Sequence, residues 1–278
     1  MKRFPSIPPI TDVADSCFED GHLWLIEKVD GAHFRFQLQE SGLIRFGDRN
    51  RVYDDPDAVP EPYRHAVRHV RTNLEREALR DAVDDVETLV FFGEAMHRHT
   101  IDYDWERTPS FLGFDVWSAQ KERFYSVDTV ERIFNQLGLH TVNVFERERR
   151  ARDFDPDSYS VPQSAWYDGP AEGVIVQNKR GQRATLLHPS FREIEATAPV
   201  NASAAEVAET YATQRRFETL SSELEERDRP VTFDTLYERV LEDIGREEHD
   251  RLYHESEPVD MKAFRSEVSA LTRRFLEE

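Results

Sequence analysis

A lysine separates an apolar run from an Asp-Gly turn in the stretch LIEKVDG, residues 25–31. Lysine is scarce in this chain: it occurs five times, so the 36 Lys and Arg residues include 36 − 5 = 31 arginines. Arginine cannot replace a lysine that must lose a proton, because a guanidinium stays protonated in proteins. A lysine becomes a nucleophile when burial or a nearby cation lowers its pKa. Lys28 is therefore predicted to be a nucleophile, and a surface lysine beside a turn is the alternative.

Four other charged or aromatic residues lie in short stretches that could contribute to a functional site. Glu94 and Glu172 adjoin glycines, Phe114 lies in an apolar run, and Arg49 follows an Asp in RFGDRN. Each also has an ordinary structural explanation: a surface or turn acid, a core aromatic, or one member of a solvated ion pair. Only their order around Lys28 favours the functional interpretation.

The elements that must position these residues are mostly strands. Phe34, Phe36 and Leu38 alternate with polar residues, which indicates a strand with one buried face. Strands are expected at residues 22–27, 34–38, 43–46, 88–93, 111–117, 124–127, 171–177 and 183–187, and helices from 61 to 74 and from 128 to 137.

After about residue 196 the pattern becomes helical. Ser203 and Glu206 form a capping box, and apolar residues recur at helical spacing over 233–244 and 261–275. The sequence therefore predicts an α+β fold with two domains, a strand-rich domain over 1–195 and a helical domain over 196–278.

The net charge of the chain is −19. Many acids with few lysines indicate adaptation to a salty cytoplasm, where a Debye length of about 3 Å at 1 M salt limits repulsion of a polyanion; an ordinary acidic protein with no nucleic-acid partner is the alternative. A single cysteine, Cys17, fits a reducing cytoplasm, and no apolar run is long enough to span a membrane.

Several short motifs occur in one order along the chain, and Arg49 falls between the first two. They are EKVDG (27–31), FGE (92–94), FDVW (114–117), EGVIV (172–176) and HPSFRE (188–193). Together they resemble the covalent nucleotidyltransferases, and within them the ATP-dependent RNA ligases of the nick-sealing phage-type branch and their archaeal relatives. The resemblance implies an antiparallel-sheet nucleotidyltransferase domain, here with a C-terminal helical module.

The resemblance also implies a reaction: Lys28 would attack the α-phosphate of ATP, and the AMP would then activate an RNA 5′-phosphate for a 3′-OH. Glu172 would act in catalysis and, with Glu94, hold Mg²⁺ or Mn²⁺. RNA would be the partner, and no oligomeric state is implied. The remaining residues implied to bind the nucleotide are Glu27, Asp30, Gly31, Arg49, Phe114, Lys179 and Arg183.

One position departs from this family. Lysines of the fifth motif would fall at Thr185 and Leu187, and the chain offers only Lys179 and Arg183 nearby. Because charge on the α-phosphate needs a cation, a catalytically impaired, ligase-like protein that binds nucleotide or RNA is the alternative function.

Three weaker patterns stay open. Two basic clusters either contact RNA or form a charged surface. The first contains Arg64, His65, Arg68, His69 and Arg71, and the second contains Arg147, Arg149, Arg150 and Arg152.

His97 and His99 suggest a metal site, but without a partner cysteine or a helical pair of histidines the pattern indicates a loop.

Overall fold

The computed structural model describes residues 1–14, 17–55, 58–191, 202–253 and 259–277. The chain divides into two compact units, one of residues 1–96 and 101–194 and one of residues 97–100 and 195–278. The domain boundary expected after residue 195 falls in the range 192–201, outside the described residues, as do the last two residues of HPSFRE. The expected α+β class with antiparallel sheets is confirmed.

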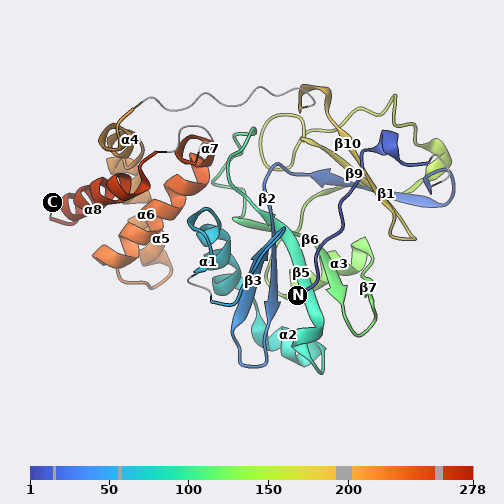
Figure 1. The fold of residues 1–278 in the computed structure, drawn as a ribbon, viewed down its shortest axis with the longest axis horizontal. Helices are drawn as coiled ribbons and strands as arrows, with labels where there is room; N and C mark the ends of the chain where they lie inside the picture. The colour runs from blue at the N-terminus through green and yellow to red at the C-terminus, as the bar shows by residue number, and fades with distance from the viewer. Residues whose placement is uncertain (15–16, 56–57, 192–201, 254–258, 278) are drawn as a thin grey trace. The chain divides into compact units, whose positions relative to one another are not determined.

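Within the described residues, the first unit contains a six-stranded antiparallel sheet in the order β4-β3-β2-β5-β6-β7 (Figure 1). Phe34 and Phe36 of the second strand pack in the larger hydrophobic core. Because side chains alternate along a strand, His33 faces the opposite side, where it lines a cavity. The strands are β2 (Ala32–Leu38), β3 (Ile44–Asp48), β4 (Val52–Tyr53), β5 (Leu89–Ala95), β6 (Phe111–Ser118) and β7 (Arg123–Phe124).

Three helices contribute to the core that contains Phe34 and Phe36. Val67 and Val70 of the first helix and Phe134 of the third are buried there. Gly113 is required on the sheet side, since a Cβ at that position would lie 2.3 Å from the Phe134 ring. The helices are α1 (Arg64–Asn73), α2 (Arg76–Ala82) and α3 (Val127–Gln136).

A four-stranded antiparallel sheet in the order β10-β9-β1-β8 completes the strands of the described first unit. Both faces of β1 are covered: Leu23 and Leu25 pack in one core, and Trp24 and Ile26 pack in another. A strand covered on both faces has no polar alternation, which explains the continuous apolar run before Lys28. The strands are β1 (His22–Lys28), β8 (Val144–Arg150), β9 (Gly173–Asn178) and β10 (Arg183–Leu187).

Two local expectations differ from the structure. The strand expected over 124–127 stops at Phe124, because Ser126 is the N-cap of α3, and its backbone carbonyl accepts hydrogen bonds from the amides of Thr129 and Val130. The edge strand β8 was missed, because its residues FERERR are charged and half exposed. Charged residues are common on edge strands, where they discourage pairing with other chains.

The N-terminal segment runs past β5 and β6 toward β10 (Figure 1). The amide of Thr185 donates to the carbonyl of Pro8 at 2.8 Å, and Pro9 forms a parallel bridge with Thr185. Short 3-10 turns elsewhere in the first unit are η1 (Ile10–Asp12), η4 (Glu61–Tyr63), η5 (Val86–Thr88), η6 (Ala151–Asp153) and η7 (Pro189–Phe191).

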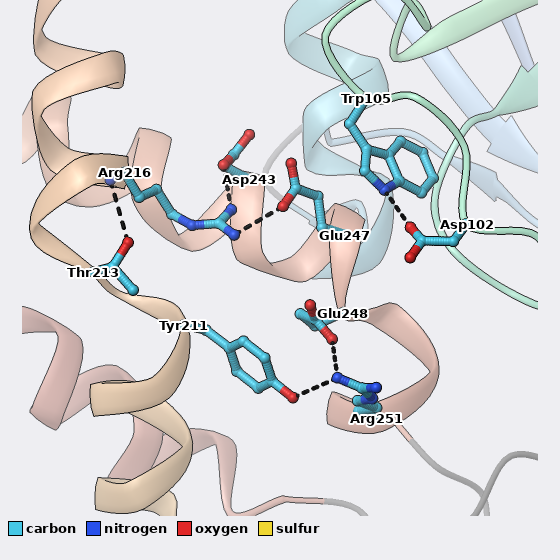
Figure 2. Close-up of polar contacts among 9 residues, drawn as sticks. All are labelled: Asp102, Trp105, Tyr211, Thr213, Arg216, Asp243, Glu247, Glu248 and Arg251. Carbon is cyan, nitrogen blue, oxygen red and sulfur yellow. Dashed lines mark hydrogen bonds and ion pairs between the residues drawn. The ribbon is translucent and has the colours of Figure 1, made fainter. Parts of the chain in front are cut away.

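The second unit is helical in the described residues. Its core contains Leu220, Leu236 and Phe264, each at most 2% exposed. Figure 2 shows Arg216 bridging to Asp243 and Glu247, which ties one helix to the next through a partly buried ion pair. The helices are α4 (Ala204–Tyr211), α5 (Gln214–Glu226), α6 (Phe233–Glu247), α7 (His249–Leu252) and α8 (Met261–Glu277).

The expected capping box is confirmed at the start of α4: Ser203 Oγ accepts from the Glu206 amide and Glu206 accepts from the Ser203 amide. Of the helices that the structure describes, none is both long and apolar enough to cross a membrane.

Candidate active site

A cavity in the first unit is lined by both sheets and by the N-terminal segment. Strands β1, β2, β5, β6, β9 and β10 each contribute side chains to it. Most of the residues singled out in the sequence line this cavity: Glu27, Lys28, Gly31, Arg49, Glu94, Phe114 and Arg183.

Lys28 ends β1 and is paired in register with Gly173 of β9. This pairing brings the preceding residue, Glu172, beside the lysine, and the Lys28 ammonium forms an ion pair with the Glu172 carboxylate. Their side chains are 31% and 16% exposed; Lys28 lines the cavity, whereas Glu172 is not among its lining residues. Residues 144 positions apart in sequence thus form one lysine–carboxylate group.

The two acids that flank Lys28 in the motif are held by the backbone around them. The Glu27 carboxylate accepts from Ser164 Oγ at 2.5 Å and from the Ala165 amide at 3.2 Å, and burial raises its pKa. Asp30 Oδ2 accepts from the Ile101 amide at 3.0 Å. Glu27 and Asp30 therefore fix neighbouring loops, and of the two only Glu27 lines the cavity.

Gly31 is required by a close backbone approach. A Cβ at this position would lie 2.8 Å from the Ala95 carbonyl oxygen and 3.2 Å from Glu94 Cβ. Any side chain would therefore push β5 away from the Asp-Gly turn and displace Glu94 from the cavity.

An irregularity in β6 turns two adjacent side chains toward the cavity. The pairing of β5 with β6 shifts between Phe92–Asp115 and Gly93–Gly113, leaving Phe114 as the extra residue. Such a bulge interrupts the alternation of side chains and is common near active sites. Phe114 and Asp115 consequently both line the cavity.

Arg183 lines the cavity from β10, and its side chain is buried. Its guanidinium pairs with Asp115, and the two side chains are 7% and 4% exposed; Arg183 Nε also donates to Gln177 Oε1 at 3.0 Å. Burial raises the pKa of Asp115 to about 7, although Arg183 acts to lower it. Thr185, where a fifth-motif lysine would fall, also lines the cavity.

Arg49, His33 and Glu94 form a further part of the cavity wall. His33 of β2 and Glu94 of β5 are opposite each other in register. Burial, together with the positive charges of Arg35 and Arg49, lowers the pKa of His33 to about 4. His33 is therefore neutral at pH 7.

Lys179 occupies a different place. It lies on the turn after β9 and pairs with Glu148 at 3.1 Å, with both side chains more than half exposed. It borders a second cavity, with Trp24 and Trp117, instead of the one that contains Lys28.

Sequence reasoning missed the contribution of the N-terminal segment. The Phe4 ring lies 4.9 Å from that of Phe114, centroid to centroid, and the Arg183 guanidinium lies 5.2 Å from the Phe4 ring. Ser6 accepts a hydrogen bond from Arg49 at 3.1 Å. No local pattern marks Phe4, whereas Asp115 was detectable as part of the FDVW motif.

Two arginines of the second basic cluster are engaged in surface pairing. Arg147 forms ion pairs with Asp128 and Glu131, and Arg149 pairs with Glu146. For this cluster the pairing favours a charged surface over an RNA path. In the first cluster, His65 of α1 is buried, so it does not belong to an exposed basic face.

Comparison with known proteins assigns the chain to a family. A family model described as RNA ligase matches residues 21–191, more than half of the chain. A search of curated proteins finds no match. Among solved structures, the chain is similar to a mutant RNA ligase of Naegleria gruberi with ATP and Mn, with a TM-score of 0.54 and 12% identity over 69% of this chain and 57% of that one.

A second similar structure is an archaeal ATP-dependent RNA ligase, with a TM-score of 0.51 and 16% identity over 100% of this chain and 65% of that one. At such identities the likeness shows the fold, and the chain spans less than two thirds of either protein. The family match runs from the start of β1 to the turn after β10 and so covers both sheets around the cavity. This chain therefore belongs to the RNA ligase family.

Proposed function

We propose that this protein is an ATP-dependent RNA ligase that joins 3′-OH and 5′-phosphate ends through a lysyl-AMP intermediate on Lys28. The observation that carries the proposal is the ion pair between Lys28 and Glu172 beside the cavity that Phe114 and Arg49 line. A lysine held by a carboxylate, with an aromatic surface and an arginine nearby, suits a nucleotide with a charged phosphate chain.

In the first step, Lys28 Nζ attacks the α-phosphorus of ATP. Lys28 first loses one ammonium proton to solvent, so that the neutral amine attacks. The new P–N bond forms as the bond to pyrophosphate breaks, and the proton that Nζ then loses passes to Glu172, whose carboxylate already contacts it. In the second step, an RNA 5′-phosphate oxygen attacks the AMP phosphorus, and the P–N bond breaks as Lys28 Nζ takes back the proton held by Glu172. In the third, the 3′-OH attacks the activated 5′-phosphate, AMP leaves, and the hydroxyl proton passes to solvent.

The remaining wall residues bind and orient the nucleotide. Phe114 offers its ring to the adenine, Arg49 contacts phosphate, and Arg183 is the arginine closest in sequence to the absent fifth-motif lysines. Glu27, Asp30 and Gly31 shape the turn around Lys28 through the contacts described above. Lys179 pairs with Glu148, so we give it no part in the reaction.

Glu172 and Glu94 supply hard carboxylate oxygens, which fit Mg²⁺ or Mn²⁺. A divalent ion held there would reduce the charge of the triphosphate. We further propose nick sealing in RNA repair, as in the phage-type branch and its archaeal relatives, in a salt-rich cytoplasm, because the chain is strongly acidic and arginine-rich.

The test is intact-mass analysis after incubation with ATP and Mg²⁺ or Mn²⁺ in concentrated KCl, following a pyrophosphate wash to remove any bound AMP. We expect a gain of one AMP in the wild type and none in Lys28→Ala. Lys121→Ala, which removes an exposed lysine outside the cavity, is the matched control and should gain AMP normally. Adduct formation in Lys28→Ala would refute the role of Lys28.

A catalytically impaired nucleotide- or RNA-binding protein is the second candidate. It is favoured by Thr185 in place of a lysine and by the engagement of Arg183 with buried Asp115. In that case the folded wild type would bind ATP without gaining mass and would not seal a nicked RNA duplex.

A further inference from the structure

Three histidines converge in the second unit. His97 and His99 lie on the segment of residues 97–100, and His249 begins α7. The Nε2 atoms of His97 and His99 are 3.1 Å apart, and the rings of His97 and His249 stack with centroids 3.9 Å apart. One ring nitrogen from each histidine lies within 4.8 Å of the other two.

A carboxylate lies behind two of these rings. Asp250 Oδ1 is 3.4 Å from His99 Nδ1 and 3.7 Å from His249 Nδ1, and its side chain is 14% exposed. Metal-binding histidines commonly present the second ring nitrogen to a carboxylate, which fixes the ring and its tautomer. In His99 this arrangement turns Nε2 toward His97.

The two segments that carry the histidines are fixed by other contacts. The Arg98 amide donates to the Arg246 carbonyl at 2.9 Å, which holds residues 97–99 against the end of α6. Arg251 donates to Tyr211 and to Glu248, each at 2.9 Å, which anchors α7 (Figure 2). The histidines are therefore brought together before any ion binds.

We propose that His97, His99 and His249 bind a first-row transition-metal ion, that Zn²⁺ is the preferred ion, and that Asp250 orients the rings. Imidazole nitrogen suits zinc, and three protein ligands leave a fourth position for water. Bond lengths of about 2.0–2.1 Å in a tetrahedron place ligand nitrogens roughly 3.3 Å apart. The His97–His99 separation already approaches this value, and small side-chain rotations close the rest.

This site differs in chemistry from the carboxylates beside Lys28. Imidazoles select zinc-like ions, whereas Glu172 and Glu94 favour hard ions such as Mg²⁺. The sequence alone indicated a loop at His97 and His99, because their partner is His249, some 150 residues later.

The experiment uses the full-length protein without an affinity tag, stripped with EDTA and titrated with ZnCl₂ by calorimetry and with CoCl₂ by visible absorption. We expect one equivalent of zinc per chain and a tetrahedral Co²⁺ spectrum. His249→Gln should weaken binding by at least 100-fold, and Asp250→Asn by about 10- to 100-fold. His140→Ala, which removes an exposed histidine, and Glu172→Gln should both bind as the wild type.

Three results would overturn the proposal: no stoichiometric zinc binding, unchanged binding in His249→Gln, or loss of binding in Glu172→Gln alone. The first would leave a hydrogen-bonded histidine cluster. Circular dichroism checks that each variant folds. If His249→Gln does not fold, the wild type decides the question. It must show the tetrahedral Co²⁺ spectrum and a zinc-dependent rise in Tm of several degrees. Glu172→Gln must show the same rise in Tm.

Discussion

Two cation–carboxylate pairs contribute to the same cavity, and they differ in solvent exposure and in the ability of the cation to lose a proton. Lys28 and Glu172 are 31% and 16% exposed, whereas Arg183 and Asp115 are 7% and 4% exposed. The first pair joins a lysine, which can lose a proton, to an acid that can accept it. The second joins an arginine, which cannot, to a buried acid whose pKa is about 7. The first pair is thus suited to proton transfer, and the second is suited to a structural role.

The comparison predicts that an arginine, which keeps the positive charge but cannot lose a proton, does not replace Lys28 in the reaction. Lys28→Arg retains a cation for Glu172, so Tm should be unchanged. Because a guanidinium is not deprotonated, the rate of AMP transfer to the protein should fall by at least about 1,000-fold. Single-turnover kinetics with labelled ATP would measure it. A rate within tenfold of the wild type would show that position 28 is not the nucleophile.

For the Arg183–Asp115 pair, the expected effect is on stability. Arg183→Ala leaves the Asp115 carboxylate buried without its partner, which should cost about 3–5 kcal/mol of unfolding free energy. The loss should be smaller at pH 6 than at pH 8, because Asp115 can bind a proton at the lower pH. Urea unfolding in KCl at both pH values would measure it.

Arg107→Ala is the matched control for this prediction. Arg107 pairs with Asp168 at 3.2 Å, but the side chains are 44% and 101% exposed. Exposed pairs contribute less than about 1 kcal/mol. Equal losses in the two variants would contradict the distinction between a structural pair and a surface pair.

His33 extends the comparison to pH. Its pKa is lowered from 6.5 to about 4 by burial and by Arg35 and Arg49, with Asp48 opposing them. Between pH 6.5 and 4 the unfolded chain therefore binds more protons, so stability falls as the pH drops through this window. Lowering the pH from 7 to 4.5 should reduce the unfolding free energy of the wild type, and His33→Asn should make this reduction smaller by about 2–3 kcal/mol.

Unfolding free energies of the wild type and His33→Asn at these two pH values would test this prediction. The difference between the two proteins isolates His33 from the many carboxylates that also titrate. Parallel pH profiles would mean that His33 has an ordinary pKa. His140→Asn, at an exposed position, should follow the wild-type profile.

The smallest expected effect concerns the N-terminal segment. The rings of Phe4 and Phe114 are 4.9 Å apart, which leaves no room for a base between them. If adenine stacks on this side of Phe114, Phe4 competes with it, and Phe4→Ala should tighten ATP binding a few-fold. Calorimetric titration would measure it, with Leu43→Ala, an exposed apolar side chain at 60%, as control. Weaker ATP binding would show instead that Phe4 supports the base.

The local features of this protein follow from residues that are near neighbours in the chain. Alternation at Phe34 and Phe36, the continuous apolar run before Lys28 and the capping box at Ser203 are consequences of near neighbours in the chain, and all appear in the structure. The order of the motifs was sufficient for the family, which the match over residues 21–191 confirms.

The contacts between distant residues depend on the tertiary structure. Strand register brings Glu172 to Lys28, and a bulge brings Asp115 to Arg183. Chain folding brings the ring of Phe4 against that of Phe114 and the ring of His249 against that of His97. These partners are far apart in sequence, and their contacts depend on how strands align and helices dock. Propensity and spacing act over a few residues, so they identify groups capable of chemistry, whereas burial and long-range register determine which of those groups meet.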